Sequence, residues 1–556
     1  MITTQLIKKT PSAYEYPLIL KQIIQMPLYM FPDKKIYYQE HVSYTYQTLY
    51  KRISALANVL KDLDVRPGQT IGVMDWDSHR YLESFFAIPM MGAIMHTINI
   101  RLSHEQIVYT INHAEDDVLL VHEDFLPIIE AVRNQLTTVK HIICLSDSPT
   151  PAEPNITIVG HYDTLVEQAP ETFDFQEFDE NTWATTFYTT GTTGLPKGVY
   201  FSHRQLVLHT YGLLSIFNTM NSQAKLSTDD VYMPLTPMFH VHAWGMPYLC
   251  TMLGMTQVYP GRYEPQRIIQ LIDSKQVTFS HCVPTILHMI LNHPCIKDVD
   301  LSKWQIIIGG SALPKSLCQA AMDVGINVYS AYGMSETGPL LTVANLKSHM
   351  ITDKSKSDQI AIRCKTGLPA SLVQIRIIDP DGNDVPHDGI STGEIVARAP
   401  WLTQGYYKDE DNSESLWQDG WLHTGDIGTI DEEGYLQITD RLKDVIKTGG
   451  EWISSLALED LFLQHQSVSE CAIIGVPDQK WGERPFAMIV LKPEYKDKTT
   501  PDDIRSFLLN FAKEGLITKY AVPEKIEFVD TIAKTSVGKI NKRMLREQWR
   551  SLNRIG

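Results

Sequence analysis

The sequence predicts an α/β protein, built as a large N-terminal domain followed by a small α+β C-terminal domain. Three observations support this prediction. Short apolar runs alternate with amphipathic stretches over the first third of the chain, the same rhythm returns after residue 277, and turn signals become dense from about residue 365. Alternating strands and helices are typical of a doubly wound parallel sheet. We therefore expect two doubly wound α/β subdomains in the large domain.

The predicted elements of the first subdomain follow one another closely. The apolar run Thr70–Met74 is typical of a buried strand, and the amphipathic stretch Arg80–Gly92 predicts a helix after it. The same reasoning predicts, in chain order, a helix, a strand, a helix and a strand at Ile107–His113, Val118–His122, Leu126–Leu136 and His141–Leu145. Strands of the second subdomain are expected at Val277–Val283, Trp304–Ile308 and Val328–Tyr332.

A change of texture near Lys365 predicts a third part of the large domain. Short β-branched runs now lie between turn signals at Asp379–Asn383, Asp388-Gly389, Asp419-Gly420 and Glu432–Gly434. This pattern predicts an antiparallel sheet or a small β-barrel-like subdomain.

A new alternation begins after Asp440-Arg441-Leu442-Lys443. It predicts strands at Ala472–Val476 and Ala487–Leu491 and a helix at Pro501–Lys513. We expect a large domain over residues 1–440 and a small one over residues 441–556, with a hinge near 440–443.

Bulk composition excludes several classes of protein. With 556 residues, 43% hydrophobic and 21% charged, the chain has the composition of a multidomain globular protein and not of a disordered or fibrous one. Seven scattered cysteines without a CxxC pair argue against a disulfide framework or a zinc site. The net charge of −16, without a basic stripe carrying aromatics, argues against a nucleic-acid partner.

No secretory signal or membrane span is expected in this sequence. The longest apolar stretch, Phe85–Met95, is interrupted by Pro89 and is too short to cross a bilayer. We therefore predict a cytoplasmic location without stable membrane insertion. Peripheral membrane association is left open.

The run Tyr188–Gly198 (YTTGTTGLPKG) is the sharpest local signal for chemistry. Its glycines let the backbone expose amide groups, its threonine hydroxyls add donors, and Lys197 adds a positive charge. Together these groups predict a cradle for a polyphosphate, although the spacing is not that of a Walker A loop. The alternative is a flexible surface turn.

Five later motifs carry weaker signals. Ser335 and Glu336, in the loop Tyr332–Pro339, could hold an α-phosphate and Mg²⁺ together, because Mg²⁺ prefers oxygen ligands. Gly309–Ala312 is a strand-end glycine pair where the backbone could approach a flat base, and Asp426 could accept both ribose hydroxyls. The remaining two motifs are cationic: Arg441, Lys443 and Lys447 on a glycine-terminated segment, and Lys539 just after a glycine near the end of the chain.

These motifs, in this order, resemble the adenylate-forming superfamily of acyl-CoA synthetases, luciferases and peptide-synthetase adenylation domains. The resemblance covers essentially the whole chain. Within it, Pro237–Trp244 and Asp440–Ser454 are similar to the bacterial and archaeal branch of medium- and long-chain fatty acyl-CoA synthetases. Two positions depart from the family pattern: Ser335 replaces a common threonine, and Ala533 stands where proline is usual.

The resemblance also implies roles for individual residues. Lys539, Glu336, Lys443 and His240 would be catalytic, and Thr189 and Glu336 would lie near Mg²⁺. His240 and Trp244 would bind the acyl group, with Trp244 as a gate, and Gly449 and Gly450 would face coenzyme A. ATP or AMP would be bound by Thr189, Thr190, Gly191, Thr192, Thr193, Gly194, Lys197, Gly310, Ala331, Tyr332, Gly333, Ser335, Asp426, Arg441, Lys447 and Trp452. The alternatives are a core tryptophan at Trp244 and a hydrogen-bonded structural histidine at His240.

The implied reaction converts a medium- or long-chain fatty acid, ATP and coenzyme A into acyl-CoA, AMP and diphosphate. The small domain would be mobile and would turn about Lys443 between the two half-reactions. Three alternatives remain at this stage: a ligase for aryl or other acids, an acyl-AMP ligase that loads a carrier protein, and a non-catalytic nucleotide- or lipid-binding protein. The partners are expected to be small molecules, with a homodimer possible by analogy.

Overall fold

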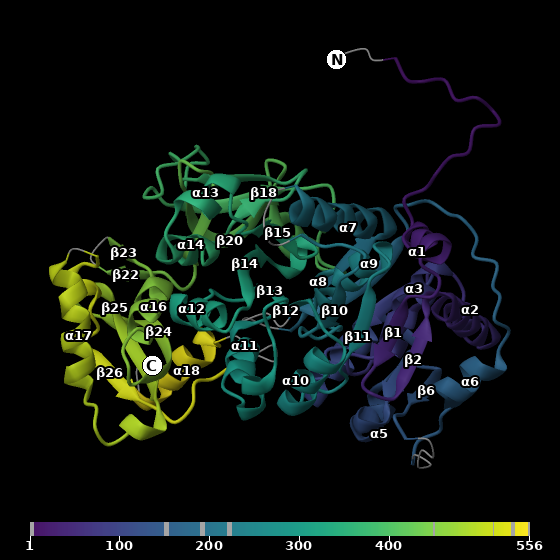
Figure 1. Cartoon of the computed structure of the whole chain (residues 1–556), viewed down its shortest axis with the longest axis horizontal. Coiled ribbons are helices and arrows are strands. Elements are labelled where there is room, and N and C mark those ends of the chain that lie inside the picture. Colours follow the sequence, from purple (N-terminus) through teal and green to yellow (C-terminus); the bar gives the residue numbers. More distant parts are fainter. Residues whose placement is uncertain are drawn as a thin grey trace.

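The computed structural model describes residues 5–148, 155–189, 195–219, 225–448, 451–514, 516–534 and 540–553; at 451, 452, 552 and 553 it describes the backbone alone. These residues form four sheets of seven, nine, five and five strands. Figure 1 shows the C-terminal domain, coloured yellow-green, at one end of the molecule and the first α/β subdomain at the other. The predicted fold class is confirmed, with the large α/β domain and the smaller C-terminal domain both present.

The first subdomain is a seven-stranded sheet in the order β7-β6-β5-β3-β4-β8-β9, parallel except for the β8–β9 pair. Its strands are β3 (Thr70–Met74), β4 (Ile94–Thr97), β5 (Asp116–His122), β6 (His141–Leu145), β7 (Gly160–His161), β8 (Trp183–Thr189) and β9 (Lys197–Ser202). Its helices are α2 (Tyr46–Asp62), α3 (His79–Met90), α4 (His104–Ala114), α5 (Leu126–Val132) and α6 (Tyr162–Gln168). The predicted strands at β3 and β6 have the observed bounds, because each is a short apolar run that is buried on both faces.

The second subdomain is a nine-stranded sheet in the order β16-β15-β14-β13-β12-β10-β11-β1-β2. Its strands are β1 (Lys35–Tyr38), β2 (Val42–Thr45), β10 (Val231–Pro234), β11 (Thr256–Tyr259), β12 (Phe279–Cys282), β13 (Gln305–Ile308), β14 (Asn327–Gly333), β15 (Leu340–Val343) and β16 (Leu368–Pro369). The helices are α1 (Gln25–Met30), α7 (His203–Asn218), α8 (Val241–Trp244), α9 (Met246–Met252), α10 (Pro265–Ser274), α11 (Pro284–Leu291), α12 (Lys315–Asp323), α13 (Ser348–Asp353) and α14 (Lys356–Arg363). The N-terminal hairpin β1–β2 therefore belongs to the second sheet, where β1 pairs in parallel with β11.

The third part of the large domain is an antiparallel sheet in which β17, β18 and β20 pair in order and β20 also pairs with β19 and β21. Its elements are β17 (Gln374–Ile378), β18 (Gly393–Arg398), α15 (Glu410–Leu416), β19 (Trp417–Gln418), β20 (Trp421–Ile430) and β21 (Leu436–Arg441). Of the two predicted forms, these pairings are those of an open sheet.

The C-terminal domain has its own sheet and two apolar cores. Its elements are β22 (Ile446–Thr448), β23 (Glu451–Ile453), α16 (Ser455–Leu463), β24 (Val468–Asp478), β25 (Gly482–Leu491), α17 (Pro501–Lys513), β26 (Lys525–Phe528) and α18 (Lys542–Asn553). Successive residues of β24 alternate between the cores: Cys471 and Ile473 pack on one side, and Ala472 and Ile474 on the other. Within the described residues, no helix combines the length and the apolar character that crossing a membrane requires.

A buried ion pair joins the last helix to the rest of the C-terminal domain. Lys542 lies 2.7 Å from Glu459, with side-chain exposures of 8% and 10%, and also donates to the Ser455 hydroxyl. The same Ser455 donates its amide and hydroxyl to Asp440 of β21. Lys542 thus neutralises a carboxylate that would otherwise be buried alone.

We expect Lys542→Ala to destabilise this domain by about 3–5 kcal/mol, because it leaves Glu459 buried without its cation. The measurement is thermal unfolding combined with hydrogen exchange of β24 and β25. Arg543→Ala is the control, since Arg543 pairs with Glu547 at the surface, and should have a small effect. A Lys542→Met/Glu459→Met double variant should recover most of the loss. Equal effects at Lys542 and Arg543 would contradict this account.

Candidate active site

The candidate site lies where the central strands of the second sheet end. In a parallel sheet the carboxyl ends of neighbouring strands meet along one edge, where ligands bind. Gly309 and Gly310 follow β13, and Ala331, Tyr332 and Gly333 close the neighbouring strand β14. Gly310 has a positive φ of 79°, a conformation that glycine adopts readily. This edge therefore carries the predicted base-binding residues side by side.

Asp426 joins this edge to the antiparallel sheet. Its carboxylate accepts a hydrogen bond of 2.8 Å from the Tyr332 hydroxyl and lies 3.2 Å from the Arg441 guanidinium. Asp426 and Arg441 are paired residues on adjacent strands, β20 and β21. The Asp426 side chain is 7% exposed and that of Arg441 47%. Burial and the neighbouring Asp426 raise the pKa of Tyr332 well above its ordinary value, so its hydroxyl remains a donor.

Glu336 sits in a short turn after β14, within electrostatic reach of Arg441. Its Oε1 accepts a hydrogen bond of 2.6 Å from the hydroxyl of Tyr406, a residue that the sequence motifs did not single out. The Lys197 ammonium lies 4.7 Å from the centre of the Tyr406 ring and donates to Asn412 at 2.6 Å. Tyr406 therefore stands between Glu336 and Lys197 and links the two predicted phosphate-binding segments.

The phosphate-binding run itself is described only at its ends. Thr189 ends β8 and pairs with Lys197, which begins β9 across the antiparallel ladder. The predicted residues between them, Thr190, Gly191, Thr192, Thr193 and Gly194, lie outside the described residues. Thr189 and Lys197 thus bracket that run from adjacent strands.

The predicted magnesium ligands supply oxygen donors of the right kind. In the described part of the chain, no three His, Cys, Asp or Glu side chains gather closely enough to hold a metal ion by themselves. Mg²⁺ keeps several waters and commonly binds through one or two carboxylates together with substrate phosphates. The Glu336 carboxylate and the Thr189 hydroxyl therefore fit an ion that arrives with a nucleotide.

The predicted acyl-binding residues lie on a left-handed turn. Val241, His242, Ala243 and Trp244 all have φ between 47° and 59°, and Gly245 follows at 74°. The Trp244 ring packs against His281 of β12, with 5.0 Å between the ring centroids, and against Gly309. His240 precedes the turn and is half-buried. Trp244 and the predicted base-binding edge are therefore in direct contact.

Three histidines around this turn are buried and uncharged. Burial lowers the pKa of His209, His242 and His281 to about 3. His209 accepts the Leu340 amide at 3.2 Å, and His281 pairs with the Tyr232 hydroxyl at 2.8 Å. They act as neutral polar groups that fix local geometry, so none of them adds a charge to the site.

The predicted hinge is bound by residues of the C-terminal domain. Arg546 of α18 donates to Asp444 at 2.6 Å and to the Lys443 carbonyl at 3.4 Å. Desolvation and the neighbouring Arg441 cation lower the pKa of Lys443. Lys447 lies on β22, where its amide donates to Glu483 at 3.0 Å.

Of the remaining predicted residues, one lies beside Glu336 and the others fall outside the described parts of the chain. Ser335 lies beside Glu336 in the same turn and is half-buried. Gly449, Gly450 and Lys539, and the side chain of Trp452, are not among the parts of the chain that the structure describes. The structure therefore brings Gly310, Tyr332 and Asp426 together around the ends of β13 and β14. The roles expected for Gly449, Gly450 and Lys539 remain predictions.

Comparisons with known proteins agree with this arrangement. The family model described as AMP-binding enzyme matches residues 26–407, and the AMP-binding enzyme C-terminal domain matches residues 457–539. A long-chain-fatty-acid–CoA ligase of Thermus thermophilus is 40% identical over 510 residues, which cover 91% of this chain and 90% of that protein. A 3-methylmercaptopropionyl-CoA ligase of Ruegeria lacuscaerulensis is 39% identical over 498 residues, covering 89% and 90%.

A solved structure extends the likeness to the fold. The anthranilate CoA ligase AuaEII in complex with anthranoyl-AMP superposes with a TM-score of 0.83 at 24% identity, covering 97% of this chain and 99% of that one. The matches to the two family models, the similar proteins and the order of the sequence motifs all agree with one another. The chain belongs to the AMP-binding enzyme family, within the adenylate-forming superfamily that its motifs resemble.

Proposed function

We propose that this protein activates a medium- or long-chain fatty acid with ATP and transfers the acyl group to coenzyme A. The observation that carries the proposal is the meeting of Tyr332, Asp426, Arg441 and Glu336 where β13 and β14 end. A partly buried edge that offers both hydrogen-bond donors and carboxylate acceptors suits an adenine nucleotide. The acyl half of the proposal rests on the Trp244 segment, which lies against the same edge.

In the first half-reaction, the fatty carboxylate attacks the α-phosphorus of ATP and diphosphate leaves. Two anions must approach each other, so cations whose effect strengthens as charge shifts are required. Lys197 would supply positive charge from the large domain and Arg441 from the domain boundary, and Asp426 would hold the ribose hydroxyls. Lys539 would bridge the carboxylate and the α-phosphate. Mg²⁺, bound by Glu336 and Thr189, would neutralise charge on the departing diphosphate.

The second half-reaction needs the coenzyme A thiol at the acyl carbonyl. We place the domain boundary at 440/441 and the pivot at Lys443, so that the C-terminal domain can present Lys539 in one state and Gly449-Gly450 in the other. Supporting this, β21 ends at Arg441 and β22 begins at Ile446, which leaves a short connection. No side chain need be the nucleophile, because proximity of bound substrates supplies much of the rate.

Two observations support the fatty-acid assignment, and the name of one similar protein favours a different acid. Trp244 is buried among apolar residues beside the nucleotide edge, and the Thermus relative is named for long-chain fatty acids. A relative of almost equal identity is named for 3-methylmercaptopropionate, a short sulfur-containing acid. An aryl or other short acid, or a carrier protein as acceptor, therefore remains the second candidate.

An end-point assay of AMP tests both candidates. The full chain is incubated with ATP, Mg²⁺, coenzyme A and each saturated acid from hexanoate to octadecanoate, with aryl acids and 3-methylmercaptopropionate alongside. We expect AMP release to require a fatty acid and acyl-CoA to accumulate in equal amount. A pantetheinylated carrier protein in place of coenzyme A is the acceptor control. No AMP with any saturated acid would refute the fatty-acid assignment.

A further inference from the structure

The left-handed turn before α9 is conformationally expensive. An L-residue in the left-handed helical region costs about 1–2 kcal/mol, and runs of such residues are rare. Here Val241, His242, Ala243 and Trp244 occupy that region consecutively. Strain of this kind persists only where the surroundings determine the conformation. The contacts around the turn must therefore hold it in place.

The turn is wedged between the two α/β sheets. On one side, His242 packs edge-on against Phe85 of α3 and Phe187 of β8, with ring centroids 5.7 and 5.1 Å apart. On the other side, Trp244 rests on Gly309 so closely that a Cβ there would lie 2.9 Å from the ring. A turn that relaxed to an ordinary conformation would move Trp244 off Gly309.

Two buried side chains from the first sheet bind the backbone immediately before the turn. Asp77, which follows β3, accepts the Met238 amide at 2.8 Å. Thr97, at the end of β4, donates its hydroxyl to the Phe239 carbonyl at 2.9 Å. Both side chains are almost fully buried, at 3% and 1% exposure. The entry to the turn is thus fixed to the first sheet, and Trp244 touches the second.

Asp77 is itself firmly placed. Its second oxygen accepts a 2.5 Å hydrogen bond from the Tyr263 hydroxyl, and its carbonyl accepts the Gly261 amide at 2.9 Å. Burial raises the pKa of Asp77 to about 7, although the hydrogen bonds from Tyr263 and Met238 act in the opposite direction and lower it. The neighbouring charged groups are Asp75 and Arg101.

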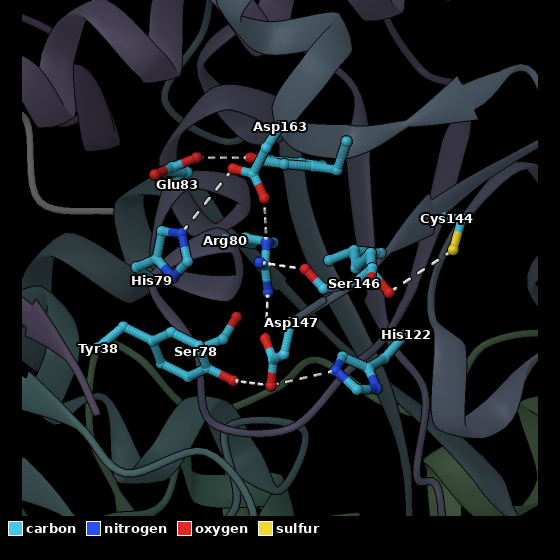
Figure 2. A network of polar contacts seen from close by, with 12 residues as sticks. Tyr38, Ser78, His79, Arg80, Glu83, His122, Cys144, Ser146, Asp147 and Asp163 are labelled. Atoms are coloured by element: carbon cyan, nitrogen blue, oxygen red, sulfur yellow. Dashed lines mark hydrogen bonds and ion pairs between the residues drawn. The ribbon is translucent and has the colours of Figure 1, made fainter. Parts of the chain in front are cut away.

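The next residue, Ser78, is the N-cap of helix α3, and Arg80 in the first turn of that helix belongs to a buried polar network (Figure 2). Ser78 donates to Asp75 at 2.5 Å. In the network, Arg80 binds Asp163 at 2.8 Å and Asp147 at 3.0 Å, and Tyr38 of β1 donates to Asp147 at 2.7 Å. Because Tyr38 belongs to the second sheet and Asp147 follows β6 of the first, this network ties the two sheets together.

We propose that Asp77 and Thr97 are positioning residues that hold the turn Val241–Gly245 and thereby set the acyl-chain selectivity of the enzyme. The inference rests on the proposed function, since it assigns these residues to the acyl side of that same site. Among the described residues, no hydrogen bond or ion pair joins either side chain to the nucleotide edge. Their loss should change which acid is preferred and leave the handling of ATP nearly unchanged.

The test compares kcat/KM across saturated acids for Asp77→Ala and Thr97→Val. For each, the ratio between the preferred acid and one four carbons longer should fall about tenfold, the lower end of the discrimination that a hydrophobic pocket gains from one methylene. The KM for ATP should stay within about twofold. Asp77→Asn keeps an oxygen for the Met238 amide, and Thr97→Ser keeps the hydroxyl, so both should retain the wild-type profile.

Tyr263→Phe is the matched control, because it removes the other hydrogen bond of Asp77 and leaves the Met238 contact. Its selectivity should stay that of wild type. If Asp77→Ala does not fold, Thr97→Val decides, since it exchanges only a hydroxyl for a methyl. If the variants fold and their acyl-chain selectivity is unchanged, the proposal is overturned. It is also overturned if neither Asp77→Ala nor Thr97→Val folds, because Asp77 and Thr97 would then serve the stability of the fold alone.

The same experiment separates this inference from the proposed function. If wild-type protein activates no fatty acid, the fatty-acid assignment fails at that point. The selectivity ratio is then measured within the class of acid that wild type does activate, aryl or short. An altered ratio there would still support positioning by Asp77 and Thr97.

Discussion

Replacing Glu336 with glutamine is expected to lower ATP–pyrophosphate exchange about 100-fold or more, the usual effect of removing a group that stabilises developing charge. Glutamine keeps the shape of the side chain and can still accept the Tyr406 hydroxyl, which lies 2.6 Å from Glu336. Only the negative charge is lost. Because Glu336 is only 8% exposed, solvent would compensate poorly for the lost charge.

The measurement is the exchange rate at saturating acid over a range of Mg²⁺ and ATP concentrations. Tyr406→Phe is the control: it removes the hydrogen bond but leaves the carboxylate, so its loss should be about tenfold or less. Raising Mg²⁺ should recover part of the activity of Tyr406→Phe and none of Glu336→Gln. If Glu336→Gln keeps within about threefold of wild-type exchange, the carboxylate serves only to hold Tyr406.

Much of the fold could be predicted because its strands are short, apolar and buried on both faces. Thr70–Met74 and His141–Leu145 were recognisable for that reason. The helix Pro501–Lys513 was predicted with its observed bounds from the alternation of the small domain, and its threonine cap and first proline agree with where it begins. The placement of β1 and β2 was not predictable. The pairing of β1 with β11, more than two hundred residues later, depends on tertiary contacts that leave no local pattern.

The candidate site divides in the same way. Asp426 and Arg441 carry motif signals, and the structure places them opposite each other on adjacent strands. Tyr406 and Asp77 carry none, because their partners are distant in sequence. The left-handed turn was hidden for a different reason. Valine and tryptophan disfavour that conformation, so the sequence argues locally against what the packing imposes.

Lys539→Ala should separate the two half-reactions. We expect adenylation, measured as ATP–pyrophosphate exchange, to fall by about 1,000-fold, because the substrate carboxylate and the α-phosphate would then meet without their bridging cation. Thioester formation from supplied acyl-AMP should remain near wild type. The family resemblance implies that the C-terminal domain turns before this step, so that it presents Gly449-Gly450 in place of Lys539. Both steps are measured on one preparation, the second as acyl-CoA formed from synthetic acyl-AMP.

Lys534→Ala is the matched control for this prediction. Lys534 lies five positions earlier in the same segment, and its ammonium is paired with Glu470 at 2.9 Å, within the C-terminal domain. Removing it takes away one positive charge near the chain end without removing a cation from the nucleotide, so both half-reactions should persist. Equal loss of both steps in Lys539→Ala would show that Lys539 serves the domain as a whole. A division of labour between two domain states would then be wrong, and a single arrangement would have to carry both reactions.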